Sequence, residues 1–121
     1  MSHIRSFRDM EVWKLAHTLS VKLFHMTIPL PRSEDYALTS QIRRSSNSIS
    51  ANIAEAFGRR TKKDKIYFYT VSRGSAFETQ SHLLYGSDVK YFKDEDIDAL
   101  LVEYDKLIHQ LNKIMKTLGA E

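Results

Sequence analysis

The segment EDYALTSQIRRSSNSISANIAEAFG, residues 34–58, contains no proline and only one glycine, which is its last residue. Its large apolar residues recur at spacings of four and seven, which places them on one side of an α-helix. These residues are Leu38, Ile42, Ile49, Ile53 and Phe57. Ser33 is a suitable N-cap residue, and Gly58 is suited to the end of the helix. The pattern predicts a helix from about Glu34 to Phe57 with one apolar side.

Three more helices are predicted around this one. The first carries an apolar stripe, follows a capping pair formed by Ser6 and Asp9, and ends before Pro29 and Pro31. Its stripe consists of Val12, Ala16, Leu19, Leu23 and Met26. The third helix begins after Thr61 and continues to about Ser87, but its periodicity does not define a core face. The fourth follows Asp94, carries heptad-spaced apolar residues from Ile97 to Leu118, and ends at Gly119.

The composition agrees with a single helical domain covering residues 1–121. The chain has 2 prolines and 4 glycines, so it contains few helix breakers and little turn material. We therefore predict an all-α fold, an antiparallel up-down-up-down four-helix bundle. The alternative is a pair of helical hairpins that forms a bundle only by dimerising. The sequence has no cysteine and no apolar run of about 20 residues, which favours a cytoplasmic protein over a membrane protein.

Positive charge is concentrated in the middle of the chain. The net charge is +3, but residues 43–73 contain eight Lys and Arg residues against two acidic ones. A local excess of this kind indicates a polyanionic partner, so we predict binding to RNA or single-stranded DNA through phosphates. The predicted contact residues are Arg43, Arg44, Arg59, Arg60, Lys62, Lys63, Lys65 and Arg73. The alternatives are a solvated charged face and a scaffold that binds an acidic protein.

A second stripe follows the helix of residues 34–57 on a side away from the isoleucines. It is small in its middle and polar or charged at its ends, and it consists of Gln41, Arg44, Ser48, Ala51 and Glu55. Small residues allow another helix to approach closely, so we predict that this stripe is an interface between subunits. The alternative is a serine-rich solvent face. Gly74, in the middle of the third helix, indicates a close neighbour or a kink, and its small neighbours favour close packing.

The sequence offers no recognisable catalytic machinery. It has no nucleophile elbow and no glycine-rich phosphate loop. Glu78 and His82 resemble part of a di-iron site, but the second Glu and His pair that such a site needs is missing. We therefore expect no catalytic residue, no metal and no cofactor. A metal-dependent enzyme remains the weakest of the three functional hypotheses.

Several strings resemble the bacterial four-helix bundle proteins of the 23S rRNA intervening-sequence family. The resemblance is carried by EVWKLA (11–16), YALTSQIRRSSNSISANIAEAFGR (36–59) and GSAFETQ (74–80), and it extends to KYF (90–92) and the final heptads. Ser50 replaces a frequent proline and Ala56 a usual glycine, and both changes favour helix continuity. The family's basic positions correspond to Arg43, Arg44 and Arg59, and its Asn and Glu positions correspond to Asn52, Glu55 and Glu78, which we expect to make structural polar contacts.

The resemblance also implies a mode of assembly and a class of partner. It implies a homo-oligomer in the form of a ring-like pentamer without enzymatic activity. Some members of the family are encoded inside insertions in 23S rRNA genes. Related accessory proteins of diversity-generating retroelements bind nucleic acid and a reverse transcriptase. A nucleic-acid-processing protein is therefore a further candidate partner.

Overall fold

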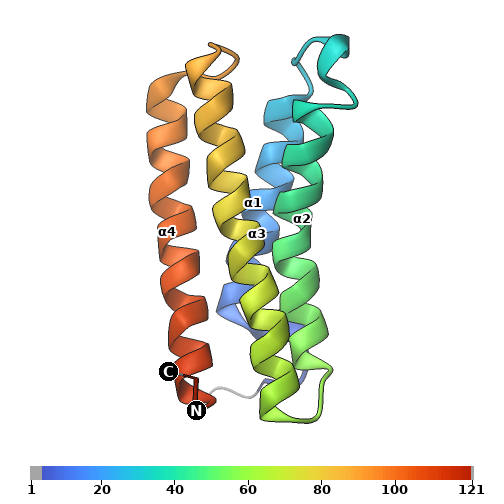
Figure 1. Ribbon diagram of the computed structural model, residues 1–121, viewed down its shortest axis with the longest axis vertical. Helices are drawn as coiled ribbons and strands as arrows, with labels where there is room; N and C mark the ends of the chain where they lie inside the picture. Colours follow the sequence, from blue (N-terminus) through green and yellow to red (C-terminus); the bar gives the residue numbers. More distant parts are fainter. Residues whose placement is uncertain (1–3, 121) are drawn as a thin grey trace.

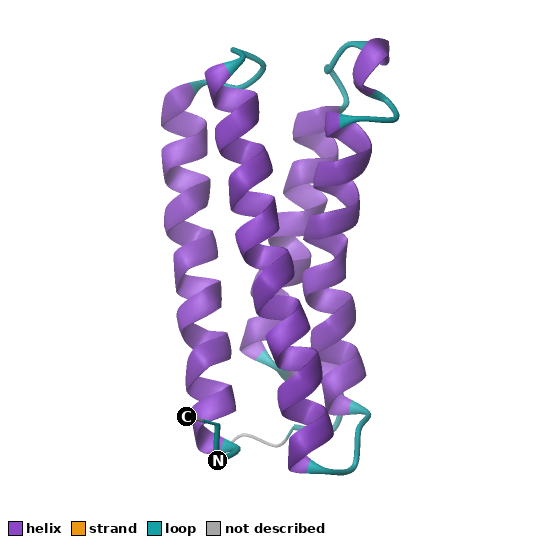
Figure 2. Cartoon of the chain, in the orientation of Figure 1, coloured by secondary structure: helices purple, strands orange, loops and turns teal. Residues whose placement is uncertain are grey.

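The computed structural model describes residues 4–120, so both ends of the predicted domain, residues 1 and 121, lie outside the described part. Within residues 4–120 the chain forms four α-helices and two short 3₁₀-helices (Figures 1 and 2). In chain order these are η1 (Phe7–Asp9), α1 (Glu11–Thr27), η2 (Arg32–Glu34), α2 (Leu38–Phe57), α3 (Lys62–Asp88) and α4 (Asp94–Thr117). None of the helices formed by these residues combines the length and the apolar character that a membrane crossing requires.

The four α-helices lie side by side, and each runs opposite to the one before it (Figure 1). The predicted up-down-up-down bundle is therefore confirmed. The helices pack around one shared core, so a single chain completes the bundle without a second hairpin. The alternative fold, in which two chains are needed to form four helices, is wrong.

The core is built mainly from the apolar stripes that the sequence predicts. Val12, Ala16, Leu19 and Leu23 of α1 are buried, as are Ile42, Ile49 and Ile53 of α2 and most of the heptad residues of α4 from Ile97 to Met115. The capping pair Ser6 and Asp9 is present, but it begins η1 and not α1. The helix α1 begins later, at Glu11. Gly119 follows the end of α4 with a φ of +104°, the left-handed conformation that glycine adopts without strain.

The predicted start of α2 is wrong by four residues. The helix begins at Leu38, and the backbone of Ala37 departs from helical geometry with φ −125° and ψ −108°. Ser33 lies inside η2 and does not cap α2. Instead, Glu34 accepts a hydrogen bond from the Leu38 amide at 3.2 Å. Glu34 also accepts one from the Tyr91 hydroxyl at 2.9 Å, and this bond raises the pKa of Tyr91.

The core face of α3 is small and polar, which explains why its periodicity was uninformative. Its buried residues include Ser72, Ala76 and Thr79, whereas several of its large residues point outward. Ser72 donates to the carbonyl of Ile49 at 2.8 Å, and Thr79 shares a 2.9 Å hydrogen bond with Ser45. Small side chains therefore bring α2 and α3 together inside one subunit, and Ser45 and Ser48 of α2 take part in this contact.

Gly74 does not pack against a neighbour within the subunit. A Cβ atom built on Gly74 would meet nothing within 4 Å among the described residues, and α3 continues through it to Asp88. The expectation of close packing is therefore wrong for the single chain. The reason is that Gly74 lies on the exposed face of α3, away from the bundle core.

Candidate nucleic-acid interface

The eight basic residues predicted to contact nucleic acid lie in separate places. Five of them lie at or beside the turn between α2 and α3, at one end of the bundle. Arg43 and Arg44 belong to the other half of α2, about 20 Å from that turn along the helix axis. Arg73 lies within α3 and faces α4. The structure therefore does not unite all eight in one surface.

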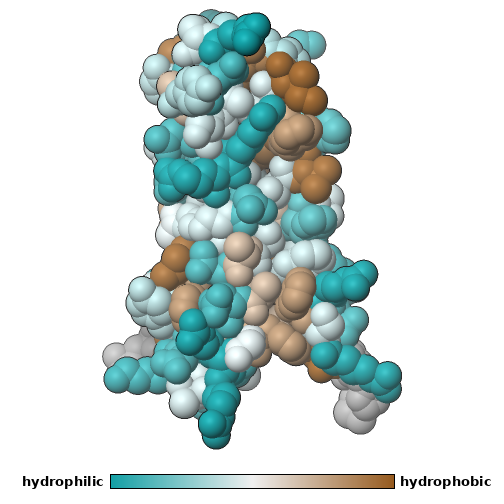
Figure 3. Space-filling view, turned by 90° about the vertical axis from the view of Figure 1, so that its right-hand side faces the viewer, coloured by the Kyte–Doolittle hydropathy of each residue, from teal (hydrophilic) through white to brown (hydrophobic). Residues whose placement is uncertain are grey.

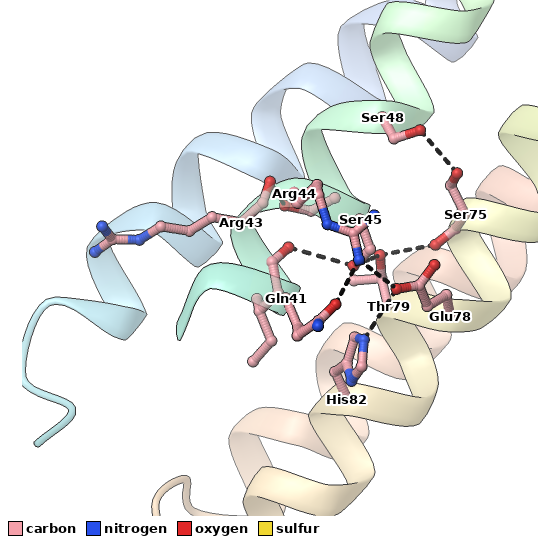
Figure 4. Close-up of polar contacts among 11 residues, drawn as sticks. Gln41, Arg43, Arg44, Ser45, Ser48, Ser75, Glu78, Thr79 and His82 are labelled. Carbon is pink, nitrogen blue, oxygen red and sulfur yellow. Dashed lines mark hydrogen bonds and ion pairs between the residues drawn. The ribbon is translucent and has the colours of Figure 1, made fainter. Parts of the chain in front are cut away.

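Arg43 and Arg44 point to opposite sides of α2 (Figure 4). Arg43 points toward α1, where its Nε donates to the Thr27 hydroxyl at 2.8 Å and its guanidinium lies 4.4 Å from the centre of the Phe24 ring. Arg44 points toward α3, where its Nη2 lies 3.6 Å from a Glu78 carboxylate oxygen. Both arginines are therefore already engaged with neighbouring helices.

Arg44 belongs to a polar cluster in the groove between α2 and α3. It also donates to the side-chain oxygen of Gln41, and the Glu78 carboxylate contacts His82 Nε2 at 3.1 Å (Figure 4). Glu78 and His82, the candidate pair for a metal site, thus contact each other. Among residues 4–120 no three His, Asp or Glu side chains converge as metal ligands.

Arg73 connects two helices. It is partly buried, and its Nη1 donates to the Asn112 side-chain oxygen on α4 at 2.8 Å. Arg73 therefore lies on the side of the bundle formed by α3 and α4, at a distance from the α2–α3 turn.

Two cations stabilise the α2–α3 turn itself. Lys65 Nζ donates to the carbonyl oxygens of Ala56 and Phe57 at 3.1 and 3.0 Å, so it satisfies the C-terminal end of α2. Arg59 lies 2.8 Å from the Glu55 carboxylate and also stacks over the ring of Phe68. These two side chains therefore have structural partners within the subunit.

The remaining three cations of the turn are exposed. Arg60, Lys62 and Lys63 take part in none of the ion pairs or side-chain hydrogen bonds found among residues 4–120. Between them, the Thr61 hydroxyl accepts from the Asp64 amide at 3.1 Å and caps α3, as the sequence predicts. The cap fixes the start of α3, so these three residues are presented together at the tip of the bundle.

The two ends of the bundle differ in charge. The end that holds the α2–α3 turn also carries the start of α1 and the end of α4 (Figure 1). These segments add Arg5, Arg8, Lys14, Lys113 and Lys116, and Figure 3 shows hydrophilic side chains projecting from this lower end. The opposite end is mainly acidic, with Glu34, Asp35, Asp88, Asp94, Glu95, Asp96 and Asp98.

The stripe predicted as a subunit interface lies on the surface along α2. Gln41, Arg44, Ala51 and Glu55 are exposed, and Ser48 is partly buried because it shares a 2.9 Å hydrogen bond with Ser75 of α3. The stripe therefore borders the groove between α2 and α3. Asn52, Glu55 and Glu78 each make a polar contact within the chain.

Sequence reasoning missed an aromatic face formed by α1 and α2. Phe24 is 47% exposed and supports Arg43, and the Trp13 and His17 rings stack with centroids 4.6 Å apart. Trp13, His17 and Phe24 follow one another at spacings of four and seven residues, which places them on a side of α1 away from its buried stripe. That spacing was the available signal, but an exposed aromatic stripe is easily assigned to packing.

The geometry thus defines a helical bundle with a basic tip. Residues 8–113 match the family described as 23S rRNA-intervening sequence protein, so the chain belongs to that family. It is similar in fold to a protein of unknown function from the S23 ribosomal protein family of Bacteroides thetaiotaomicron, with a TM-score of 0.78 and 22% identity. That similarity covers 87% of this chain and 98% of the other. No curated protein matches the sequence.

Proposed function

We propose that the protein is a non-catalytic nucleic-acid-binding protein that contacts the phosphates of RNA or single-stranded DNA through Arg60, Lys62 and Lys63. The observation that carries this proposal is the exposure of three cations without partners among the described residues, at one capped turn. When such side chains contact phosphates, they displace the cations that are condensed around the nucleic acid, and the release of these cations favours binding. The family's description, which refers to 23S rRNA, agrees with this partner. A nucleic-acid partner of this kind also favours a cytoplasmic location.

The start of α3 adds to the attraction of this turn. The first amide groups of a helix point outward and carry partial positive charge, so they complement an anion. Arg59 and Lys65 contribute to the local potential, but their contacts with Glu55, Ala56 and Phe57 make them chiefly structural. Arg43, Arg44 and Arg73 lie too far from the turn to share its phosphate contacts.

The experiment that tests this function removes the three cations and measures binding at several salt concentrations. The variant Arg60→Ala, Lys62→Ala, Lys63→Ala is expected to lose most of its affinity for a single-stranded oligonucleotide. The parent's logarithm of affinity should fall with the logarithm of salt by about 0.7 per phosphate contacted, and the variant's slope should be flatter. Its thermal stability should stay nearly constant because exposed charges contribute little to folding.

A matched control removes three cations from the acidic end. Arg32→Ala, Lys90→Gly and Lys93→Ala lower the net charge equally, and glycine suits the φ of +71° at Lys90. This control should bind almost as tightly as the parent. Equal affinity of the tip variant and the parent at the same salt would refute the assignment. Competition by an acidic polypeptide that exceeds competition by RNA would instead favour the protein-scaffold hypothesis.

The proposed function includes self-association, as the pentamer that the family resemblance implies. Two exposed features support it: the α2 stripe around Ala51 and the outward face of α3, where Tyr67, Phe77 and Tyr85 are more than half exposed around the open Gly74. Light scattering should give a mass several times that of the chain. Ala51→Arg should lower that mass and preserve the helical circular dichroism. A monomeric parent at micromolar concentration would contradict this part of the proposal.

A further inference from the structure

A groove runs between α1 and α2 on the side of the bundle shown in Figure 3. It has a volume of about 320 Å³ and is lined by His17, Ser20, Val21, Phe24, Arg43 and Asn47. Hydrophobic side chains form a column over the upper part of this face (Figure 3). Val21 and Phe24 of α1 and Ile28, which follows the helix, are exposed apolar residues. The groove therefore combines an apolar wall with polar and cationic groups.

Arg43 is held rigidly in this groove. Its Nε donates to the Thr27 hydroxyl at 2.8 Å, its Nη2 lies 3.4 Å from the Phe24 carbonyl oxygen, and its guanidinium covers the Phe24 ring at 4.4 Å. A planar cation fixed against an aromatic ring is a preformed stacking surface, since little side-chain entropy remains to be lost on binding. Beside it, the exposed Asn47 offers both a hydrogen-bond donor and an acceptor.

A second planar surface lies further along α1. The Trp13 and His17 rings are stacked with an interplanar angle of 11°, and Phe7 packs edge-on against Trp13. Trp13 and Phe24 are eleven residues apart, about 16 Å along the helix. Trp13 is partly buried against the core, so His17 is the exposed member of this pair, and it lines the groove.

The charge of this face is complementary to a polyanion. No acidic residue occurs from Val12 to Ser33 or from Tyr36 to Ala54. Arg43 is the cation of these two segments that lines the groove. Cations interleaved with aromatic rings are typical of surfaces that bind single-stranded nucleic acid. An acidic or purely apolar protein partner does not require planar groups of this kind.

We propose that the α1–α2 face binds unpaired bases of a single strand, with one base stacked on the Phe24 and Arg43 unit and its edge hydrogen-bonded by Asn47. This inference rests on the proposed function and adds a base-contacting surface to the phosphate-binding tip. Arg43 precedes the end of α2 by fourteen residues, about 21 Å, which six or so stacked nucleotides span. One strand can therefore reach both surfaces.

The test compares oligo-deoxyadenylate with an abasic strand that has the same number of phosphates. Both strands have about 15 nucleotides, which is longer than the distance between Arg43 and the tip. Trp13 is the only tryptophan in the chain, so intrinsic fluorescence reports on this face alone. Oligo-deoxyadenylate should bind more tightly than the abasic strand and quench Trp13, and the abasic strand should bind without comparable quenching.

Phe24→Ala should weaken oligo-deoxyadenylate binding by roughly 5- to 150-fold, the loss expected for one base–aromatic stack, and leave abasic binding nearly unchanged. Asn47→Asp, at an exposed position, is a second variant expected to weaken the same complex. The matched control is Tyr36→Ala, which removes another exposed ring, outside the α1–α2 face and the proposed subunit contacts, and should leave both affinities unchanged.

Equal binding of the two strands by the parent, without Trp13 quenching, would overturn the inference. The same conclusion follows if Phe24→Ala lowers the mass in light scattering, because the face would then be a contact with a second copy. Neither result affects the assignment of phosphate binding to the tip, which fails if removal of Arg60, Lys62 and Lys63 leaves salt-dependent binding intact.

Discussion

Two glycines of α3, Gly74 and Gly86, should respond to alanine in opposite ways. A Cβ atom on Gly74 would meet nothing within 4 Å among the described residues. A Cβ atom on Gly86 would lie 2.5 Å from the Cδ2 atom of Phe92 and would also overlap Cε2 of the same ring. Neither glycine has a positive φ, so the substitution itself introduces no backbone strain at either site.

The structure indicates that Phe92 cannot easily move away from Gly86. The ring is only 8% exposed, and the amides of Tyr91 and Phe92 both donate to the Gly86 carbonyl, at 2.9 and 3.3 Å. Overpacking of this kind typically costs about 1–3 kcal/mol, and the tightness of this contact favours the upper part of that range. Alanine is a better helix former than glycine, and this preference offsets up to about 1 kcal/mol of that cost.

Gly86→Ala is therefore expected to destabilise the protein by about 2 kcal/mol, whereas Gly74→Ala should stabilise it by up to about 1 kcal/mol. For a chain of this size those values correspond to a fall of roughly 8 °C and a rise of roughly 4 °C in the melting temperature. Urea unfolding followed by circular dichroism measures both free energies, and each variant serves as the control for the other.

A Gly86→Ala variant as stable as the parent would refute the packing argument at Phe92. For Gly74, the protein concentration decides the interpretation. A loss of stability in the dilute protein would refute the assignment of an open site. A loss that appears only where the chain self-associates would place Gly74 in a contact between copies, as the proposed oligomer allows.

Two further predictions concern buried polar groups and the α2–α3 turn. The Tyr104 hydroxyl is buried without a hydrogen-bond partner among residues 4–120, and burial raises its pKa. Tyr104→Phe should therefore leave the free energy of unfolding in urea unchanged or raise it by up to about 1 kcal/mol. A clear loss of stability would contradict the description of this hydroxyl as unpaired. Lys65→Met should cost about 1–2 kcal/mol because two carbonyl oxygens at the end of α2 lose a charged donor. Lys63→Met is its matched control and should have little effect on stability because Lys63 is exposed. A similar loss of stability in this control would contradict that description of Lys63.

The sequence predicts the bundle well because the fold depends on strong periodic signals. The apolar stripes of α1, α2 and α4 are regular, and Thr61, Gly58 and Gly119 mark helix ends by local chemistry. The start of α2 was missed because the carboxylate of Glu34, from outside the helix, satisfies the Leu38 amide. A tertiary arrangement of that kind leaves little local trace.

The core face of α3 and the candidate site were harder to predict for a common reason. Serine, threonine and arginine have no preferred side of a helix until their partners are known. Ser72 and Thr79 of α3 are buried because the Ile49 carbonyl and the Ser45 hydroxyl meet them, which only the assembled bundle reveals. Similarly, the sequence groups eight cations by proximity along the chain, whereas the structure separates those with partners from Arg60, Lys62 and Lys63.

The charge difference between the ends of the bundle has a consequence for how the molecule approaches its partner. The helix macrodipoles of an antiparallel bundle largely cancel, so the side chains make the subunit an electric dipole along its long axis. A nearby polyanion exerts a torque on such a dipole and turns the basic tip forward before contact. More encounters then arrive in a productive orientation, an effect on the rate of association that fades beyond the screening length of about 8 Å at physiological salt. Under the proposed function, the acidic end thereby contributes to recognition without touching the nucleic acid.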